Sequence, residues 1–262
     1  MFTERDLSGD LAGVRDAYAP GALVLDSEQD FETVPHQHRD DLAALVDDVT
    51  IRDYEASWLP EDVPRFLERL TSSDFIVGSS GDGAVAWTKQ TVPPVVLVKP
   101  RVEGSPESFV DFLVAEALVE AGLELPEQFL GFFRERYADF DDAVGRDPLT
   151  VYQLGNALYE AYCGLHTREE FETWADDYPV LYDAWEDAGE RIAPRVADLP
   201  DEIARGETDV PDAAELACNA VKHGLDVPAP FGALDSVAYR RHGADYAVKW
   251  AEKVFSPVEP EE

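Results

Sequence analysis

Cysteine is scarce in this sequence: only Cys163 and Cys218 occur among its 262 residues. Both lie in apolar stretches with helix-like spacing. That setting favours two buried thiols over a disulfide framework or a zinc site.

Long hydrophobic runs are missing as well. No apolar stretch approaches the roughly 18 residues that a membrane-spanning helix needs. The N-terminal segment MFTERDLSGDL lacks the basic region and apolar run of a signal peptide. We therefore expect a soluble, cytoplasmic protein without a membrane partner.

Basic residues are outnumbered, with 21 Lys and Arg against 55 Asp and Glu and a formal net charge of −34. In molar salt the Debye length falls to about 3 Å, so most of the resulting self-repulsion is screened. Dispersed acidity with few lysines is typical of a halophile's cytosolic protein, and it reflects the solvent rather than a basic partner. Lysine is confined to positions 89, 99, 222, 249 and 253.

Strand candidates are few and short, and all of them precede residue 105. The most apolar is Val-Val-Leu-Val at residues 95–98, and another lies at 22–25. Residues 75–78 and 84–90 are two more, separated by a Gly- and Ser-rich turn at 78–83. Short connections favour an antiparallel meander for the last three strands.

Helical patterns dominate the rest of the chain. Ser105 followed by Pro106 predicts a helix start, and Gly122 a helix end. Further helices are expected at 8–18, 35–49, 60–70, 126–142, 148–165, 209–225 and 235–255, and two or three more within 167–205.

We predict an α+β fold, predominantly α, with a small, mainly antiparallel sheet packed on a C-terminal helical bundle. One globular domain would span residues 1–255, with a soft division between a mixed part, 1–104, and the bundle, 105–255. Residues 256–262 would form a disordered tail.

Motifs with a defined chemistry are missing. The turn at 78–83 lacks the Gly-Lys-Ser/Thr of a phosphate loop, and no His-Glu-x-x-His or Gly-x-Ser-x-Gly is present. Glu116 and Glu120 share one helix face, but the Glu-x-x-His pair of helical metal sites is absent. A solvated stripe is therefore favoured, no cofactor or metal is predicted, and metal binding by this pair is left open.

The stretch 75–105 stands out because it is not acidic. Its three basic residues, Lys89, Lys99 and Arg101, exceed its two acidic ones by one charge, and it contains Trp87. Lys99 and Arg101, two apart on an extended segment, would point to the same face. These four residues could bind an anion or an acidic helix of a protein partner, or the cations could neutralise acids of this chain. Nucleic acid is excluded as a partner because three cations cannot offset the remaining charge.

A non-enzymatic binding or interaction module at these residues is the leading hypothesis, and whether the chain is an enzyme is left open. The alternative is a small-molecule enzyme, hydrolase-like, with a pocket between two low-charge helices near His166, Arg168 and His223. Charged and polar groups at helix C-termini also complement the helix dipole, which needs no functional explanation. A third possibility is a homo-oligomer built on exposed aromatic residues.

Three stretches, GDGAVAWTKQTVPPVVLVKPRVEGSPESFVDFLVAEAL, FLGFFRERY and ELACNAVKHG, carry a resemblance. In these, the sequence resembles an uncharacterised haloarchaeal protein family, a domain of unknown function. The resemblance implies a halophilic, cytoplasmic protein. It implies no activity, cofactor or catalytic residue.

Overall fold

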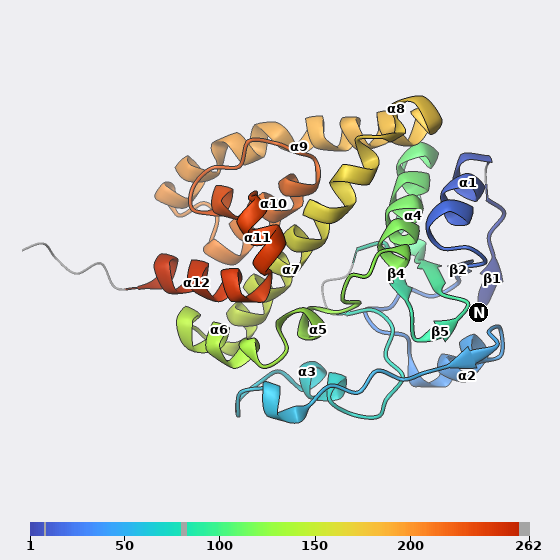
Figure 1. Ribbon diagram of the computed structural model, residues 1–262, viewed down its shortest axis with the longest axis horizontal. Coiled ribbons are helices and arrows are strands. Elements are labelled where there is room, and N and C mark those ends of the chain that lie inside the picture. The colour runs from blue at the N-terminus through green and yellow to red at the C-terminus, as the bar shows by residue number, and fades with distance from the viewer. Residues whose placement is uncertain (8, 80–82, 257–262) are drawn as a thin grey trace, which may run out of the picture. The chain divides into compact units, whose positions relative to one another are not determined.

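The computed structural model describes residues 1–7, 9–79 and 83–256 (Figure 1). The chain forms two compact units, each assembled from separated parts of the sequence. Unit 1 comprises Met1–Asp53, Arg69–Gln128 and Glu169–Asp187. Unit 2 comprises Tyr54–Glu68, Phe129–Arg168 and the chain from Ala188 on. A single domain over residues 1–255 stays a prediction, and of the predicted disordered tail, residues 257–262 lie outside the described residues.

Unit 1 is built on a four-stranded sheet of order β1-β2-β6-β4. Its strands β1 and β2 are antiparallel, β2 and β6 parallel, and β4 and β6 antiparallel. The strands are β1 (Phe2–Glu4), β2 (Leu23–Ser27), β4 (Val85–Thr88) and β6 (Val95–Val98). A separate two-stranded ribbon pairs β3 (Asp48–Val49) with β5 (Thr91–Val92).

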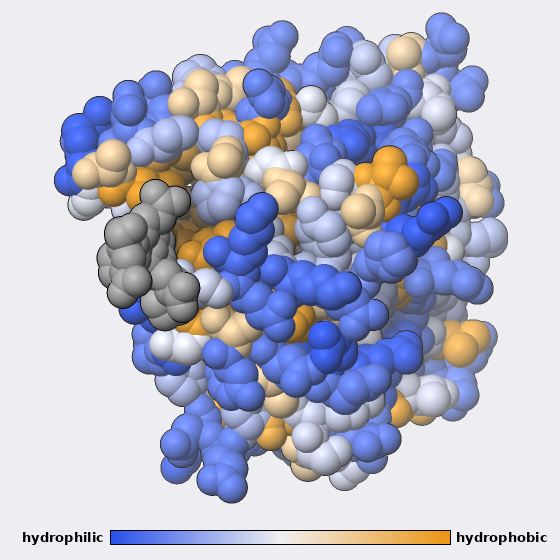
Figure 2. All heavy atoms as spheres, turned by 60° about the vertical axis from the view of Figure 1, so that its left-hand side comes forward, coloured by the Kyte–Doolittle hydropathy of each residue, from blue (hydrophilic) through white to orange (hydrophobic). Residues whose placement is uncertain are grey.

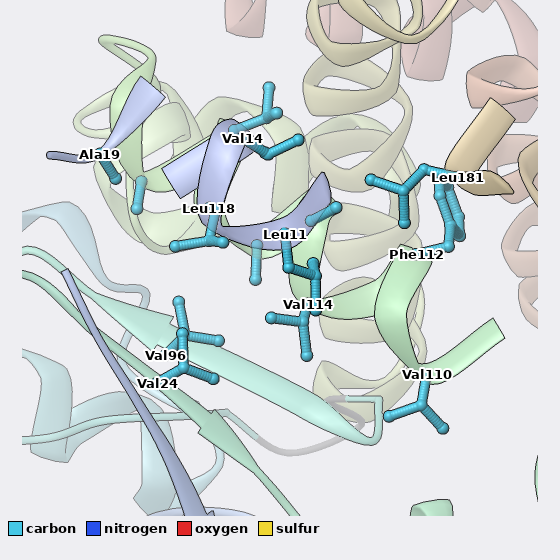
Figure 3. Close-up of a cluster of buried hydrophobic side chains, with 14 of the residues drawn as sticks. Leu11, Val14, Ala19, Val24, Val96, Val110, Phe112, Val114, Leu118 and Leu181 are labelled. Carbon is cyan, nitrogen blue, oxygen red and sulfur yellow. The ribbon is translucent and has the colours of Figure 1, made fainter. Parts of the chain in front are cut away.

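The central strand β6 is buried on both faces, which explains why its sequence is an unbroken apolar run. Since strand side chains alternate, Val96 and Val98 enter one core and Val95 and Leu97 the other. In Figure 3, Val24 and Val96 point from the sheet toward Leu118. The sheet is therefore held between two apolar layers.

One layer is formed mainly by α1 (Gly9–Tyr18) and α4 (Glu107–Gly122), which pack side by side. The helix α4 is apolar around most of its circumference, with eight buried residues. The other layer contains Leu42 of α2 (His36–Ala43) and Phe31 and Val34 of the preceding loop. Unit 1 also contains α8 (Trp174–Asp177) and the beginning of α9 (Pro179–Arg205).

One of the predicted strands is wrong. Residues 75–78 form no strand, although the Val34 N–H donates a hydrogen bond to the Val77 carbonyl. Residues 91–92, which lie between two of the predicted strands, form the short strand β5 and pair with β3. The antiparallel neighbours β4 and β6 are confirmed. Residues 80–82 of the predicted turn lie outside the described residues.

Unit 2 is helical. An aromatic cluster of edge-to-face rings joins its helices, and Phe129 contacts the rings of both Tyr137 and Tyr152. The helix α6 packs against α12. The elements of this unit are η1 (Ala56–Trp58), part of α3 (Arg65–Leu70), α5 (Phe129–Phe133), α6 (Arg136–Val144), most of α7 (Pro148–Phe171), the rest of α9, α10 (Val210–Lys222), η3 (Phe231–Leu234), α11 (Val237–His242) and α12 (Ala244–Phe255).

Several helix boundaries differ from the predicted ones. The helix expected at 126–142 is divided into α5 and α6, because Arg134 has a φ of 50° that no helix continues through. Gly243, with φ 45°, likewise divides the helix expected at 235–255. The cap of α4 is Pro106 rather than Ser105. The α+β, mainly helical fold with a small, mostly antiparallel sheet is confirmed.

Candidate functional site

The four candidate binding residues of the non-acidic stretch, Trp87, Lys89, Lys99 and Arg101, fall into two pairs. Lys99 donates its backbone N–H to Ala84, just before β4, whereas Lys89 follows the other end of that strand. The register of β4 and β6, with Val85 opposite Val98 and Thr88 opposite Val95, places the two pairs at opposite ends of this ladder. Trp87 and Lys89 therefore form one site, and Lys99 and Arg101 another.

The first pair lies at the C-terminus of α4. The Trp87 indole N–H donates to Glu120 at 2.6 Å, and the Lys89 ammonium lies 5.3 Å from the centre of the Trp87 ring. That ammonium also donates to the carbonyls of Leu123 at 2.6 Å and Leu125 at 3.2 Å. A cation at this position stabilises the carbonyl groups that a helix end leaves without intrahelical donors. Lys89 thus has a role in the fold of unit 1.

Lys99 and Arg101 do not lie on one extended segment, so that part of the prediction is wrong. The chain turns into the 3-10 helix η2 (Pro100–Val102) directly after Lys99. Lys99 is fully buried, with 0% of its surface exposed, and its ammonium lies 5.2 Å from the centre of the Phe31 ring. The Arg101 side chain points outward and keeps 30% of its surface exposed.

Two acids of the loop between β2 and α2 hold the Arg101 guanidinium. Its Nη2 lies 2.7 Å from the Asp30 carboxylate and 3.1 Å from Glu32, and its Nε donates to Asp30 at 2.8 Å. The Arg101 guanidinium, through this hydrogen bond, holds the pKa of Asp30 below its usual value. The same bond raises the pKa of Arg101. One of the interpretations of the sequence, neutralisation of acids in this chain, describes this contact.

The Asp30–Arg101 pair predicts a pH dependence. Because the folded-state pKa of Asp30 is depressed, its stabilising contribution is present above the unfolded value near 3.8 and is lost as pH falls through the lower folded value. We expect Asp30→Asn to lower the free energy of unfolding at neutral pH, and its stability to converge with that of the natural sequence once the pH falls below the depressed folded-state pKa of Asp30. Urea unfolding at a series of pH values measures the loss of stability at neutral pH and the convergence in acid. Asp40→Asn, at an exposed position, is the control. A difference that persists unchanged in acid would contradict the pair.

Sequence reasoning missed a buried polar cluster around Glu127, whose side chain is only 2% exposed. One carboxylate oxygen accepts from the Thr88 hydroxyl at 2.7 Å and the Gln90 amide at 2.9 Å. The other accepts from the Lys89 N–H at 3.0 Å and the Arg52 guanidinium at 3.2 Å. A carboxylate with four donors is a fixed anion rather than a general base. The polar run Thr-Lys-Gln-Thr after an apolar strand was the available sign of it.

The alternative enzyme residues lie in unit 2, near the ends of α7 and α10. The Arg168 guanidinium donates to the Val221 carbonyl at 2.9 Å. It also forms a bidentate salt bridge with the Asp235 carboxylate, with N···O distances of 3.0 and 3.2 Å. The His166 ring packs edge-on against Tyr162 at 4.8 Å. His223 caps α10. Arg168 thereby ties α7 to the segment that precedes His223, and the proposed enzymatic use of these residues stays a prediction.

Glu120, one of the two acids considered for a metal, accepts the Trp87 bond described above. Among residues 1–7, 9–79 and 83–256, no group of three or more His, Cys, Asp or Glu side chains is placed to hold a metal ion. Cys163 and Cys218 are both buried thiols, and burial raises the pKa of Cys218. A thiol in that state is a weak nucleophile.

These features define a mainly helical α+β protein whose small sheet carries cations at two separate places, one of which, Arg101, is paired with acids. The chain belongs to the family described as Family of unknown function (DUF7089), which matches residues 1–258. Neither a curated protein nor a solved structure matches it. No helix in the described part of the chain is long and apolar enough to cross a membrane.

Proposed function

We propose that the chain is a non-enzymatic interaction module that binds a protein partner through the Arg101 end of the sheet. The observation that carries this proposal is the setting of Arg101: an exposed guanidinium held by Asp30 and Glu32, two acids of a loop without regular structure. Lys99 is buried beside Arg101, whereas Trp87 and Lys89 lie at the other end of β4. Such a guanidinium can exchange one carboxylate for another.

The partner contact is tested by affinity co-purification of the tagged full chain from a lysate of its host in high KCl. The test variant is Arg101→Glu, because reversing the fully buried Lys99 would disrupt the core. Its matched control is Arg205→Glu, which reverses another exposed arginine bonded to a neighbouring acid, Glu207.

We expect a stoichiometric partner with the natural sequence and with Arg205→Glu, and its loss with Arg101→Glu. A folded Arg101→Glu protein that retains every partner would overturn the proposal. Bound metabolite or metal without any protein would favour the enzyme alternative instead.

We also propose that the module works in the cytoplasm of a cell with concentrated internal salt. The net charge of −34 supports this, since such self-repulsion weakens the compact state unless salt screens it. Hydrophilic residues cover most of the face drawn in Figure 2.

This environment predicts a strong salt dependence of stability. Raising KCl from about 0.1 M to about 1 M shortens the Debye length from about 10 Å to about 3 Å. We expect the urea midpoint of unfolding to rise steadily over this range. A midpoint that is flat or falls with KCl would contradict the proposed environment.

A further inference from the structure

Three consecutive residues of one loop cover both cations at the Arg101 end of the sheet. The Asp30 and Glu32 carboxylates lie on the Arg101 guanidinium, and between them Phe31 places its ring over the Lys99 ammonium. The Phe31 carbonyl also lies 3.4 Å from Arg101 Nη2. All three residues of the triplet thus contact the two cations.

This arrangement specifies a ligand chemistry. A planar guanidinium prefers carboxylates, and a desolvated ammonium is favoured by the face of an aromatic ring. The order acid, aromatic, acid matches an exposed arginine beside a buried lysine. A peptide segment with the same order would satisfy both cations in the same way.

The loop is also suited to release. It runs from the end of β2 at Ser27 to the start of α2 at His36 without regular structure. Its acids are about half exposed, so water can solvate them when they leave Arg101. The Phe31 ring is buried with Leu97 and Val95, and this keeps the loop closed when no ligand is present.

We propose that Asp30-Phe31-Glu32 is an intramolecular stand-in for a partner, and that it blocks a site for an acidic–aromatic–acidic segment of another protein. A partner's segment binds Arg101 and Lys99 when the loop lifts. This inference rests on the proposed interaction function and adds the class of ligand and its regulation. A tethered segment competes at a millimolar effective concentration, so the closed chain binds a free segment weakly.

The test measures binding of a fluorescent peptide with the sequence of residues 27–35 to the full chain in about 1 M KCl, where long-range charge effects are screened. The opened variant carries Asp30→Asn and Glu32→Gln. We expect it to bind the peptide at least about tenfold more tightly than the natural sequence. Adding Arg101→Gln to the opened variant should remove this gain in affinity. A peptide with Asn in place of Asp30 and Gln in place of Glu32 should not bind.

The matched control carries Asp40→Asn and Asp47→Asn, the same change of net charge at two exposed positions nearby. Equal gains in both double variants would assign the effect to net charge and overturn the proposal. Glu32→Gln alone, which leaves the Asp30–Arg101 pair, must show a smaller gain in the same direction. No gain in any folded loop variant, verified by its urea midpoint, would also overturn it.

The two proposals fail separately. If Arg101→Glu loses its partner but the opened variant gains no affinity for the peptide, the interaction module stands and the blocking loop is wrong. If Arg101→Glu loses nothing from the lysate, the proposed function itself is wrong.

Discussion

Replacing Gly122 by alanine is expected to destabilise unit 1 by about 3 kcal/mol. A Cβ atom at this position would lie 2.6 Å from the carbonyl carbon of Tyr18, and its overlap with the Tyr18 oxygen would be closer still. Both obstacles are backbone atoms at the end of α1, so no side chain can rotate away. The clash can be relieved only by moving α1 away from α4, which opens the core between them.

The direction of this change in stability distinguishes a steric clash from an effect of helix propensity. Gly→Ala within a helix ordinarily stabilises by up to about 1 kcal/mol, because alanine has the higher helix propensity. Gly9→Ala is the matched control: it lies at the first residue of α1, where an added Cβ has no atom within 4 Å. Urea unfolding should show a large loss for Gly122→Ala and a change within about 0.5 kcal/mol for Gly9→Ala. A neutral Gly122→Ala would show that α1 and α4 do not approach as closely as described.

Gly122 also shows where sequence reasoning succeeds for the wrong reason. A glycine after an apolar periodic stretch predicts a helix end, and α4 does end there. Gly122 does not adopt the left-handed conformation of that motif. Glycine fits at this position because a side chain there would clash with the Tyr18 backbone. A contact across about a hundred residues leaves no local pattern, so the sequence could not indicate it.

The parts of the fold that local patterns determine were predictable. The run at 95–98 became the central strand β6, and the apolar stretch after Pro106 became α4. Turns set by backbone conformation were not: Arg134 interrupts a convincing helical pattern with a positive φ in a residue that rarely adopts one.

For the candidate site, the amino-acid composition predicted which stretch of the chain is not acidic, but not the contacts of its side chains. Counting charges found the non-acidic stretch, but the partners of its cations come from distant segments, Asp30 for Arg101 and Leu123 for Lys89. The depth of Lys99 depends on how Phe31 packs, which no spacing reveals. The composition therefore indicated the stretch, whereas the structure shows which of its cations are buried and which are exposed.

The contacts of Glu127 also come from segments distant in the sequence, so no local pattern predicts them. Replacing Glu127 by glutamine keeps the size of the side chain but exchanges one acceptor oxygen for an NH₂ group. Whichever way the amide turns, that group faces donors: Thr88 and Gln90 on one side, or the Lys89 N–H and Arg52 on the other. Buried donors left without an acceptor cost about 1–3 kcal/mol each.

We expect Glu127→Gln to lower the free energy of unfolding by about 3 kcal/mol, and Glu124→Gln, at an exposed position in the same segment, by less than about 0.5 kcal/mol. The loss in the free energy of unfolding for Arg52→Gln should lie between these two values, because Arg52 is 37% exposed and water can replace part of its bond to Glu127. Hydrogen exchange provides a local test: the Lys89 amide, which donates to Glu127, should lose protection in Glu127→Gln. Similar losses for all three variants would mean that the four bonds to Glu127 do not act as one buried cluster. The predicted order instead requires that this carboxylate fixes the end of β4 to the segment that follows α4, and it thereby fixes the Trp87–Lys89 end of the sheet.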